Sequence, residues 1–151
     1  MSEHIIKSHN KTLLLYHLVF PVKYRRKVFS DEVEKTLKVI CLGIENGYEI
    51  NFVEIGADED HVHFLVQSVP ILGITRIVTI IKSITAKELF KSHPEIKKTE
   101  LWGGNLWTSG YYANTVSKYN NEKAIQDYVQ NQGKKYTRIY QGQLKLFEGI
   151  V

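Results

Sequence analysis

The order of apolar segments along the chain is the feature that most limits its fold. Four stretches rich in β-branched and aromatic residues are typical of strands, and two amphipathic stretches with helical spacing separate them. The expected strands are 13–22, 48–55, 61–69 and 106–116, and the expected helices are 31–47 and 74–93. This strand–helix–strand–strand–helix–strand order predicts a ferredoxin-like α+β fold, in which helices cover one face of an antiparallel sheet.

Local signals mark where the helices begin and end. Ser30 is a good N-cap for the first helix, and Gly47 is a suitable terminator. A third helix is expected at about 120–132, closed by Gly133, and a tail follows over 133–151. We therefore expect one domain over residues 1–151, with an additional C-terminal helix after the ferredoxin-like core.

Composition narrows the class of protein. The 151 residues are 43% hydrophobic, which is enough for a core, and the formal net charge of +4 fits an anionic partner such as nucleic acid. Cys41 is the single cysteine, so no disulfide can form within the chain. No apolar run reaches the roughly 18 residues that a membrane-spanning helix needs. We expect a soluble, cytoplasmic protein with no membrane partner.

The triplet His61-Val62-His63 is the most informative motif. Alternate residues of a strand point to the same face, so both imidazoles should leave the sheet side by side and could converge on one metal ion. Asp58 and Asp60 precede them and could orient an imidazole or hold a metal-bound water. Chance occurrence is the alternative, and two ligands are too few for a tight site.

The third predicted helix could supply what the histidines lack. Tyr128 and Gln132 are four residues apart and should share a helix face. The Gln132 carbonyl is a candidate third ligand, and the combined donor set suits Mg²⁺ or Mn²⁺. A cation there would stabilise the phenoxide of Tyr128, which could attack a phosphodiester. An ordinary half-buried tyrosine is the alternative.

A basic segment follows the first strand. Lys23, Arg25 and Arg26 could neutralise phosphates, and Tyr24 could stack on a base. A solvated basic loop is the alternative. Trp102 and Trp107 are expected to pack in the core or at its edge.

Three stretches together resemble the single-tyrosine HUH transposases of the insertion-sequence 200/605 family. The similarity extends from about Ser8 to the C-terminus, and the order of the motifs makes it specific. The matching stretches are Tyr16-His17-Leu18-Val19-Phe20-Pro21-Val22-Lys23-Tyr24-Arg25-Arg26, Asp58-Glu59-Asp60-His61-Val62-His63-Phe64-Leu65, and Leu106 through Val116 followed by Tyr128-Val129-Gln130-Asn131-Gln132.

The resemblance implies a specific function. His61, His63 and Gln132 would hold Mg²⁺ or Mn²⁺, and Tyr128 would attack single-stranded DNA to form a 5′-phosphotyrosine. The partners would be single-stranded DNA with hairpins at the element ends and a second copy of the chain. In such a homodimer, each active site could combine the histidines of one subunit with the tyrosine helix of the other.

Other functions would use the same fold. A domesticated HUH endonuclease would process chromosomal hairpins with the same residues, whereas replication initiators and relaxases usually carry further domains. A non-catalytic nucleic-acid-binding module would leave Tyr128 and the histidine pair dispensable. A two-histidine phosphoesterase needs two separate His-x-Ser/Thr motifs, and no such pair is found here.

Overall fold

A computed structural model describes residues 2–102, 104–116 and 122–130. Most of the elements in these ranges belong to one sheet and the helices packed on it. In chain order they are β1 (Ile5–Lys7), β2 (Asn10–Thr12), β3 (Leu14–Pro21), the short 3-10 turn η1 (Lys23–Arg25), α1 (Asp31–Gly47), β4 (Asn51–Asp58), β5 (His61–Ser68), α2 (Ile74–Ser92), the π-helical turn η2 (Ile96–Glu100), β6 (Tyr112–Val116) and α3 (Glu122–Gln130).

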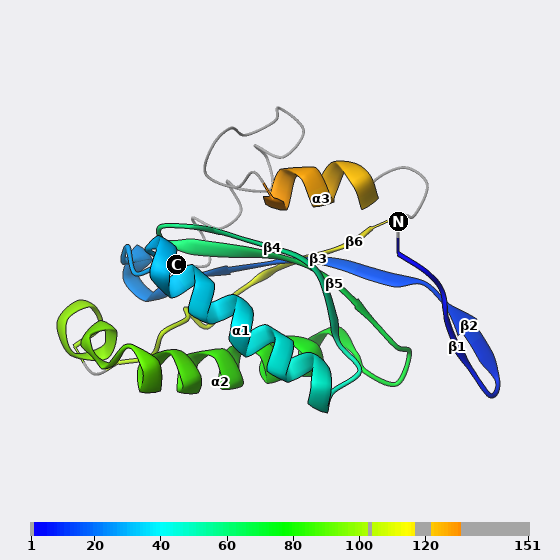
Figure 1. The fold of residues 1–151 in the computed structure, drawn as a ribbon, viewed down its shortest axis with the longest axis horizontal. Helices are drawn as coiled ribbons and strands as arrows, with labels where there is room; N and C mark the ends of the chain where they lie inside the picture. The colour runs from blue at the N-terminus through cyan, green and yellow to red at the C-terminus, as the bar shows by residue number, and fades with distance from the viewer. Residues whose placement is uncertain (1, 103, 117–121, 131–151) are drawn as a thin grey trace.

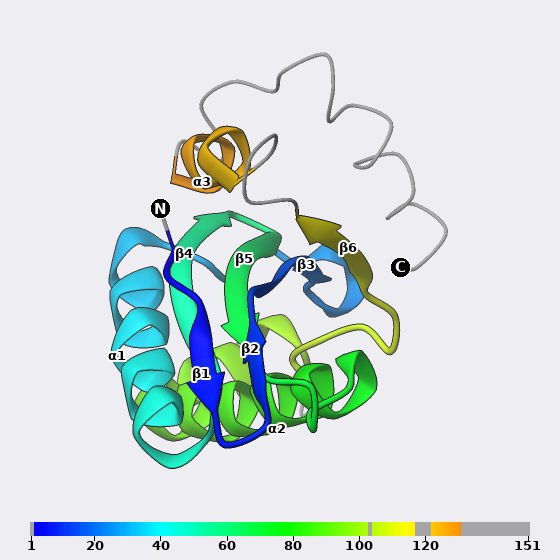
Figure 2. The ribbon, with the colours of Figure 1, turned by 90° about the vertical axis from the view of Figure 1, so that its right-hand side faces the viewer.

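The main sheet has four strands in the order β4-β5-β3-β6, and all its pairings are antiparallel. Helices α1 and α2 cover one face, whereas α3 lies over the other (Figure 1). This arrangement confirms the predicted ferredoxin-like fold with its additional C-terminal helix. Figure 2 shows the β1–β2 hairpin standing beside the end of the sheet.

Alternate side chains of β5 point to opposite faces of the sheet, and both faces are packed. Val62, Phe64 and Val66 point toward α1 and α2 and belong to the main core. The residues between them therefore face the opposite side, so His61, His63 and Leu65 share that side. Every residue of β5 is buried, which means that both faces of this strand are covered.

A second, smaller apolar cluster attaches α3 to the histidine face. Ile125 and Val129 of α3 pack with Leu15 of β3, Leu65 of β5 and Val116 of β6. Leu65 comes two residues after His63, so the packing brings α3 to the same side of the sheet as the histidines. The backbone of Tyr128 belongs to this helix.

The helix ends follow the signals in the sequence. The Ser30 side-chain oxygen accepts a hydrogen bond from the backbone N–H of Val33 at 3.3 Å, which caps α1. Helix α1 ends at Gly47, as expected. Helix α2 ends at Ser92, before Pro94.

Two strand boundaries differ from those expected. Strand β4 covers Asn51–Asp58 rather than 48–55, and β6 begins at Tyr112 rather than Leu106. The segment before β6 is held differently, because Trp107 makes only an isolated bridge with Val22 and the Lys82 ammonium donates to the carbonyls of Thr108 and Gly110, both at 2.8 Å. In a longer strand these two carbonyl groups could accept hydrogen bonds from a neighbouring strand, but here they accept from Lys82.

Among the described residues, the search for a helix long and apolar enough to cross a membrane finds none.

Candidate metal centre

His61 and His63 stand next to each other at the start of β5. Their ring centroids are 5.2 Å apart, and both side chains are buried. The strand places them on one face, as the His-Val-His spacing predicts. Two imidazoles at this separation are close enough to approach a single ion.

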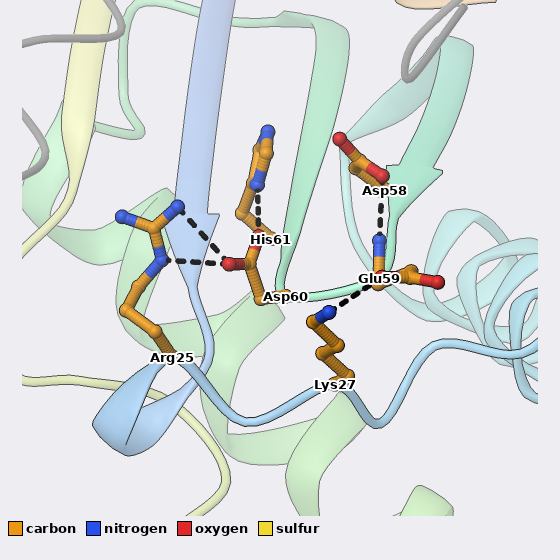
Figure 3. Close-up of polar contacts among 6 residues, drawn as sticks. All are labelled: Arg25, Lys27, Asp58, Glu59, Asp60 and His61. Atoms are coloured by element: carbon orange, nitrogen blue, oxygen red, sulfur yellow. Dashed lines mark hydrogen bonds and ion pairs between the residues drawn. The ribbon is translucent and has the colours of Figure 1, made fainter.

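Asp60 holds the first of these rings. The Nδ1 atom of His61 lies 2.6 Å from Oδ1 of Asp60, and the Arg25 guanidinium lies 3.2 Å from Oδ2 of the same carboxylate (Figure 3). Burial opposes ionisation of Asp60, but its hydrogen bonds with His61 and Arg25 outweigh that effect and lower its pKa. The carboxylate therefore stays ionised and fixes the orientation of His61.

His17 holds the second ring, and sequence reasoning did not select it. Its Nε2 atom lies 2.9 Å from Nδ1 of His63, and the two rings stack with centroids 5.1 Å apart. Burial lowers the pKa of His17 to about 4. Burial, and then the proximity of His17 and His61, holds the pKa of His63 well below its usual value. Both rings are therefore neutral near pH 7.

The register of the sheet explains this pair. His17 lies opposite Leu65 in the pairing of β3 with β5, so His63 is its diagonal neighbour on the same face. The two residues are 46 positions apart in the sequence. The sequence signal for His17 was its position inside the apolar strand predicted at 13–22. Its partner on the neighbouring strand could not be known without the register of the sheet.

The hydrogen bonds also define which nitrogen would meet a metal. Nδ1 of His61 is engaged by Asp60, and Nδ1 of His63 is engaged by His17. Each ring would then coordinate through Nε2, and a protonated Nδ1 would donate to the supporting group. Two buried rings held in this way fit the role of metal ligands.

The remaining predicted ligands and neighbours are placed as follows. Within the described ranges, no group of three His, Cys, Asp or Glu side chains is arranged to hold a metal ion. A complete site would thus need a further donor of another kind, and Gln132 lies outside the described residues. Asp58 lies opposite His61 in the β4–β5 register, and its Oδ1 accepts from the backbone N–H of Glu59 at 2.8 Å (Figure 3).

The basic segment adopts a tight turn rather than an open loop. Arg25 is directed at Asp60, so its charge supports the carboxylate that holds His61. Tyr24 is 58% exposed, and the guanidinium of Arg26 lies 4.5 Å from the ring centre of Trp102. The expectation that Trp102 packs in the core or at its edge is wrong, because 70% of this residue is exposed; the buried Trp107 does pack there, stacked on Phe29.

Comparison with known protein families places the chain in a recognised class of DNA-mobilising protein. The family described as "Transposase IS200 like" matches residues 10–132. The chain therefore belongs to the IS200-like transposases.

Two curated relatives show how close the similarity is. The ISDra2 transposase TnpA of Deinococcus radiodurans is 40% identical over 124 residues, which cover 81% of this chain and 86% of that protein. The transposase for insertion sequence element IS200 of Salmonella typhimurium is 27% identical over 125 residues, which cover 83% and 80% respectively.

Solved structures share the fold. A Deinococcus radiodurans crystal structure, described as that of a candidate transposase, aligns with a TM-score of 0.69 at 34% identity and covers 85% of this chain and 97% of its own. A REP-associated tyrosine transposase bound to a REP hairpin aligns with a TM-score of 0.54 at 8% identity and covers 82% and 70%. The second likeness shows the fold alone.

Proposed function

We propose that this transposase cleaves and rejoins single-stranded DNA at element ends marked by hairpins. Tyr128 is the nucleophile, and a divalent cation is held by His61, His63 and Gln132. The observation that carries the proposal is the pair of buried imidazoles, each held at Nδ1, on the sheet face that α3 covers. Membership of a transposase family gives the substrate class as DNA.

Mg²⁺ or Mn²⁺ is the proposed cofactor. Two imidazole nitrogens and one amide oxygen form a mixed donor set, which Mn²⁺ tolerates better than Mg²⁺. When bound, the cation supplies Lewis acidity toward a phosphodiester oxygen and favours the ionised phenol. The chain's own contribution is to hold the two rings, through Asp60 and His17, in one tautomer and one orientation.

The proposed reaction conserves the phosphodiester bond energy. The phenolic oxygen of Tyr128 forms a bond to phosphorus, and the bond from phosphorus to the 3′ oxygen breaks. The phenol loses its proton to solvent, and the departing oxygen takes up a proton to become a free 3′-OH. A 3′-OH of another strand can then displace Tyr128 from the 5′-phosphotyrosine, which restores the tyrosine and joins the strands.

Hairpin DNA is the proposed partner. The REP-associated tyrosine transposase that shares this fold is bound to a hairpin, which supports such a ligand. Lys23, Tyr24 and Arg26 offer charge and an exposed ring for DNA contact. Arg25 is assigned a different part, since its guanidinium is engaged by Asp60.

A homodimer is the proposed functional unit, on the family resemblance. The packing of Ile125 and Val129 on the sheet of their own chain supports an active site completed within one subunit. Mixing His61→Ala and Tyr128→Phe subunits tests this arrangement. If the site is completed within one subunit, the mixture stays inactive, whereas recovered cleavage would show that α3 is exchanged between subunits.

Covalent capture of DNA tests the nucleophile. The wild-type protein is incubated with Mn²⁺ and a hairpin oligonucleotide from the flanks of its own gene, and adducts are resolved on a denaturing gel. Tyr128→Phe should form no adduct. Tyr112→Phe is the matched control, because the Tyr112 ring lies 5.9 Å from that of His17 and burial raises its pKa. An adduct that survives Tyr128→Phe but not Tyr112→Phe would assign the reaction to Tyr112.

A further inference from the structure

Backbone strain is concentrated at one surface of the protein. Among the residues that the structure describes, the non-glycine residues with positive φ are Tyr24 at 58°, Arg25 at 52° and Trp102 at 51°. Such conformations are unfavourable for L-residues and are maintained only where the surroundings enforce them. Trp102 is far from the other two in the sequence, yet its ring lies 6.2 Å from that of Tyr24. The strained backbone positions of the described residues therefore lie around the rings of Tyr24 and Trp102.

The two rings are open to solvent and carry positive charge around them. Tyr24 is 58% exposed and Trp102 is 70% exposed. The Arg26 guanidinium lies 4.5 Å from the centre of the Trp102 ring, and the Lys23 ammonium lies 5.6 Å from that of Tyr24. Large exposed aromatic rings flanked by cations match the surfaces that bind unpaired nucleobases and their phosphates.

This surface is linked to the candidate metal centre through Arg25. Arg25 lies between Tyr24 and Arg26 in the chain, and its guanidinium contacts Asp60, which holds His61. The backbone at the start of the turn is anchored, because the N–H of Val22 donates to the Asp60 carbonyl at 2.9 Å and the N–H of Lys23 donates to the Leu106 carbonyl at 2.8 Å. The turn that carries Tyr24 is therefore fixed to the residue that directly precedes His61.

We infer that Tyr24, Arg26 and Trp102 form a platform on which an unpaired base of single-stranded DNA stacks beside the metal centre. This stacking platform deepens the proposed function and rests on it for the identity of the nucleic acid. A paired base inside a duplex hides its faces from side chains, so the platform selects single-stranded DNA next to the hairpin. Lys23 and Arg26 neutralise the neighbouring phosphates.

Binding without cleavage tests the platform. Tyr128→Phe protein in EDTA is titrated against a fluorescent hairpin oligonucleotide with a single-stranded flank, and anisotropy gives the dissociation constant. In this background Trp102→Ala should weaken binding roughly tenfold, which is within the range of one base–aromatic stack. Trp102→Phe should restore most of the affinity. Tyr48→Ala, which removes another exposed aromatic ring at the far end of α1, is the matched control and should bind normally.

A series of abasic oligonucleotides identifies the stacked base. Removal of that one base should cost the protein as much affinity as Trp102→Ala, and the two changes together should cost no more than either alone. Tyr24→Ala should give the same result at the same nucleotide. Unchanged affinity in both variants, or an equal loss for a fully duplex oligonucleotide, would overturn the inference. The readout needs neither metal nor adduct, so it stands even if the proposed nucleophile is wrong.

Discussion

The Nε2 atom of His17 lies 2.9 Å from the Nδ1 atom of His63, across two neighbouring strands and inside the protein. The contact links a residue of β3 to a candidate metal ligand of β5. Because His17 is neutral, its Nε2 can accept a hydrogen bond from Nδ1–H of His63, which leaves Nε2 of His63 for coordination. His17 is therefore a positioning residue for the proposed metal centre.

Replacing His17 should weaken metal binding. His17→Phe keeps a ring but removes the hydrogen-bond acceptor, and we expect the affinity for Mn²⁺ to fall by about 10- to 100-fold. His17→Gln retains an acceptor oxygen and should lose less. Isothermal titration of Mn²⁺ into the DNA-free protein measures both. His93→Gln is the control, because His93 is also buried but bonds to Thr36 instead; equal loss in all three variants would point to general destabilisation.

The contacts of Asp60 with Arg25 and His61 should also contribute to metal affinity. Asp60→Asn removes the charge that fixes His61, and we expect roughly a 10- to 100-fold loss of Mn²⁺ affinity. Arg25→Lys should have a smaller effect, because the lysine keeps a positive charge beside Asp60 and loses only the paired contact of the guanidinium. Lys27→Ala breaks the adjacent exposed pair with Glu59 (Figure 3) and should leave metal affinity unchanged. Wild-type affinity in Asp60→Asn would contradict the role of this carboxylate.

The metal-free protein should lose stability in mild acid. His17 takes up a proton near pH 6.5 when unfolded but only near pH 4 when folded, so its contribution is complete above 6.5 and is lost as the pH falls through this window. The shift corresponds to roughly 3 kcal/mol at most, and His63 acts in the same direction. Urea unfolding in EDTA at pH 7 and pH 5 measures it. His17→Gln should show a shallower decline, and a parallel decline would contradict the assignment.

Docking of α3 should be separable from folding of the core. Ile125 packs in the smaller cluster, so Ile125→Ala should weaken docking by about 2–5 kcal/mol and reduce adduct formation. Hydrogen exchange should accelerate in residues 122–130 while β5 stays protected. Lys123→Ala, at an exposed position of the same helix, is the control. Faster exchange throughout β5 would show that α3 and the sheet unfold together.

Local patterns were sufficient where local physics decides the structure. The helix from Asp31 to Gly47 is capped by Ser30 and ends at Gly47, as predicted, and the alternation in β5 correctly placed His61 and His63 on one face. The strand before Tyr112 was predicted too long, because the Lys82 side chain binds two backbone carbonyls there. Trp102 was misplaced for a similar reason, since its exposure depends on a turn more than 70 residues earlier in the chain.

The sequence by itself determined the order of strands and helices, the shared face of His61 and His63, and the family resemblance. These properties follow from periodicity and residue identity, which act over a few neighbouring positions. Only the tertiary structure decided that His17 supports His63, that Arg25 holds Asp60 rather than standing free in a basic loop, and that Tyr24 meets Trp102. Each of these contacts joins segments that are distant in the sequence, and each depends on strand register or loop geometry. The register cannot be read from local sequence, because the energy that selects it is spread over the whole packed sheet.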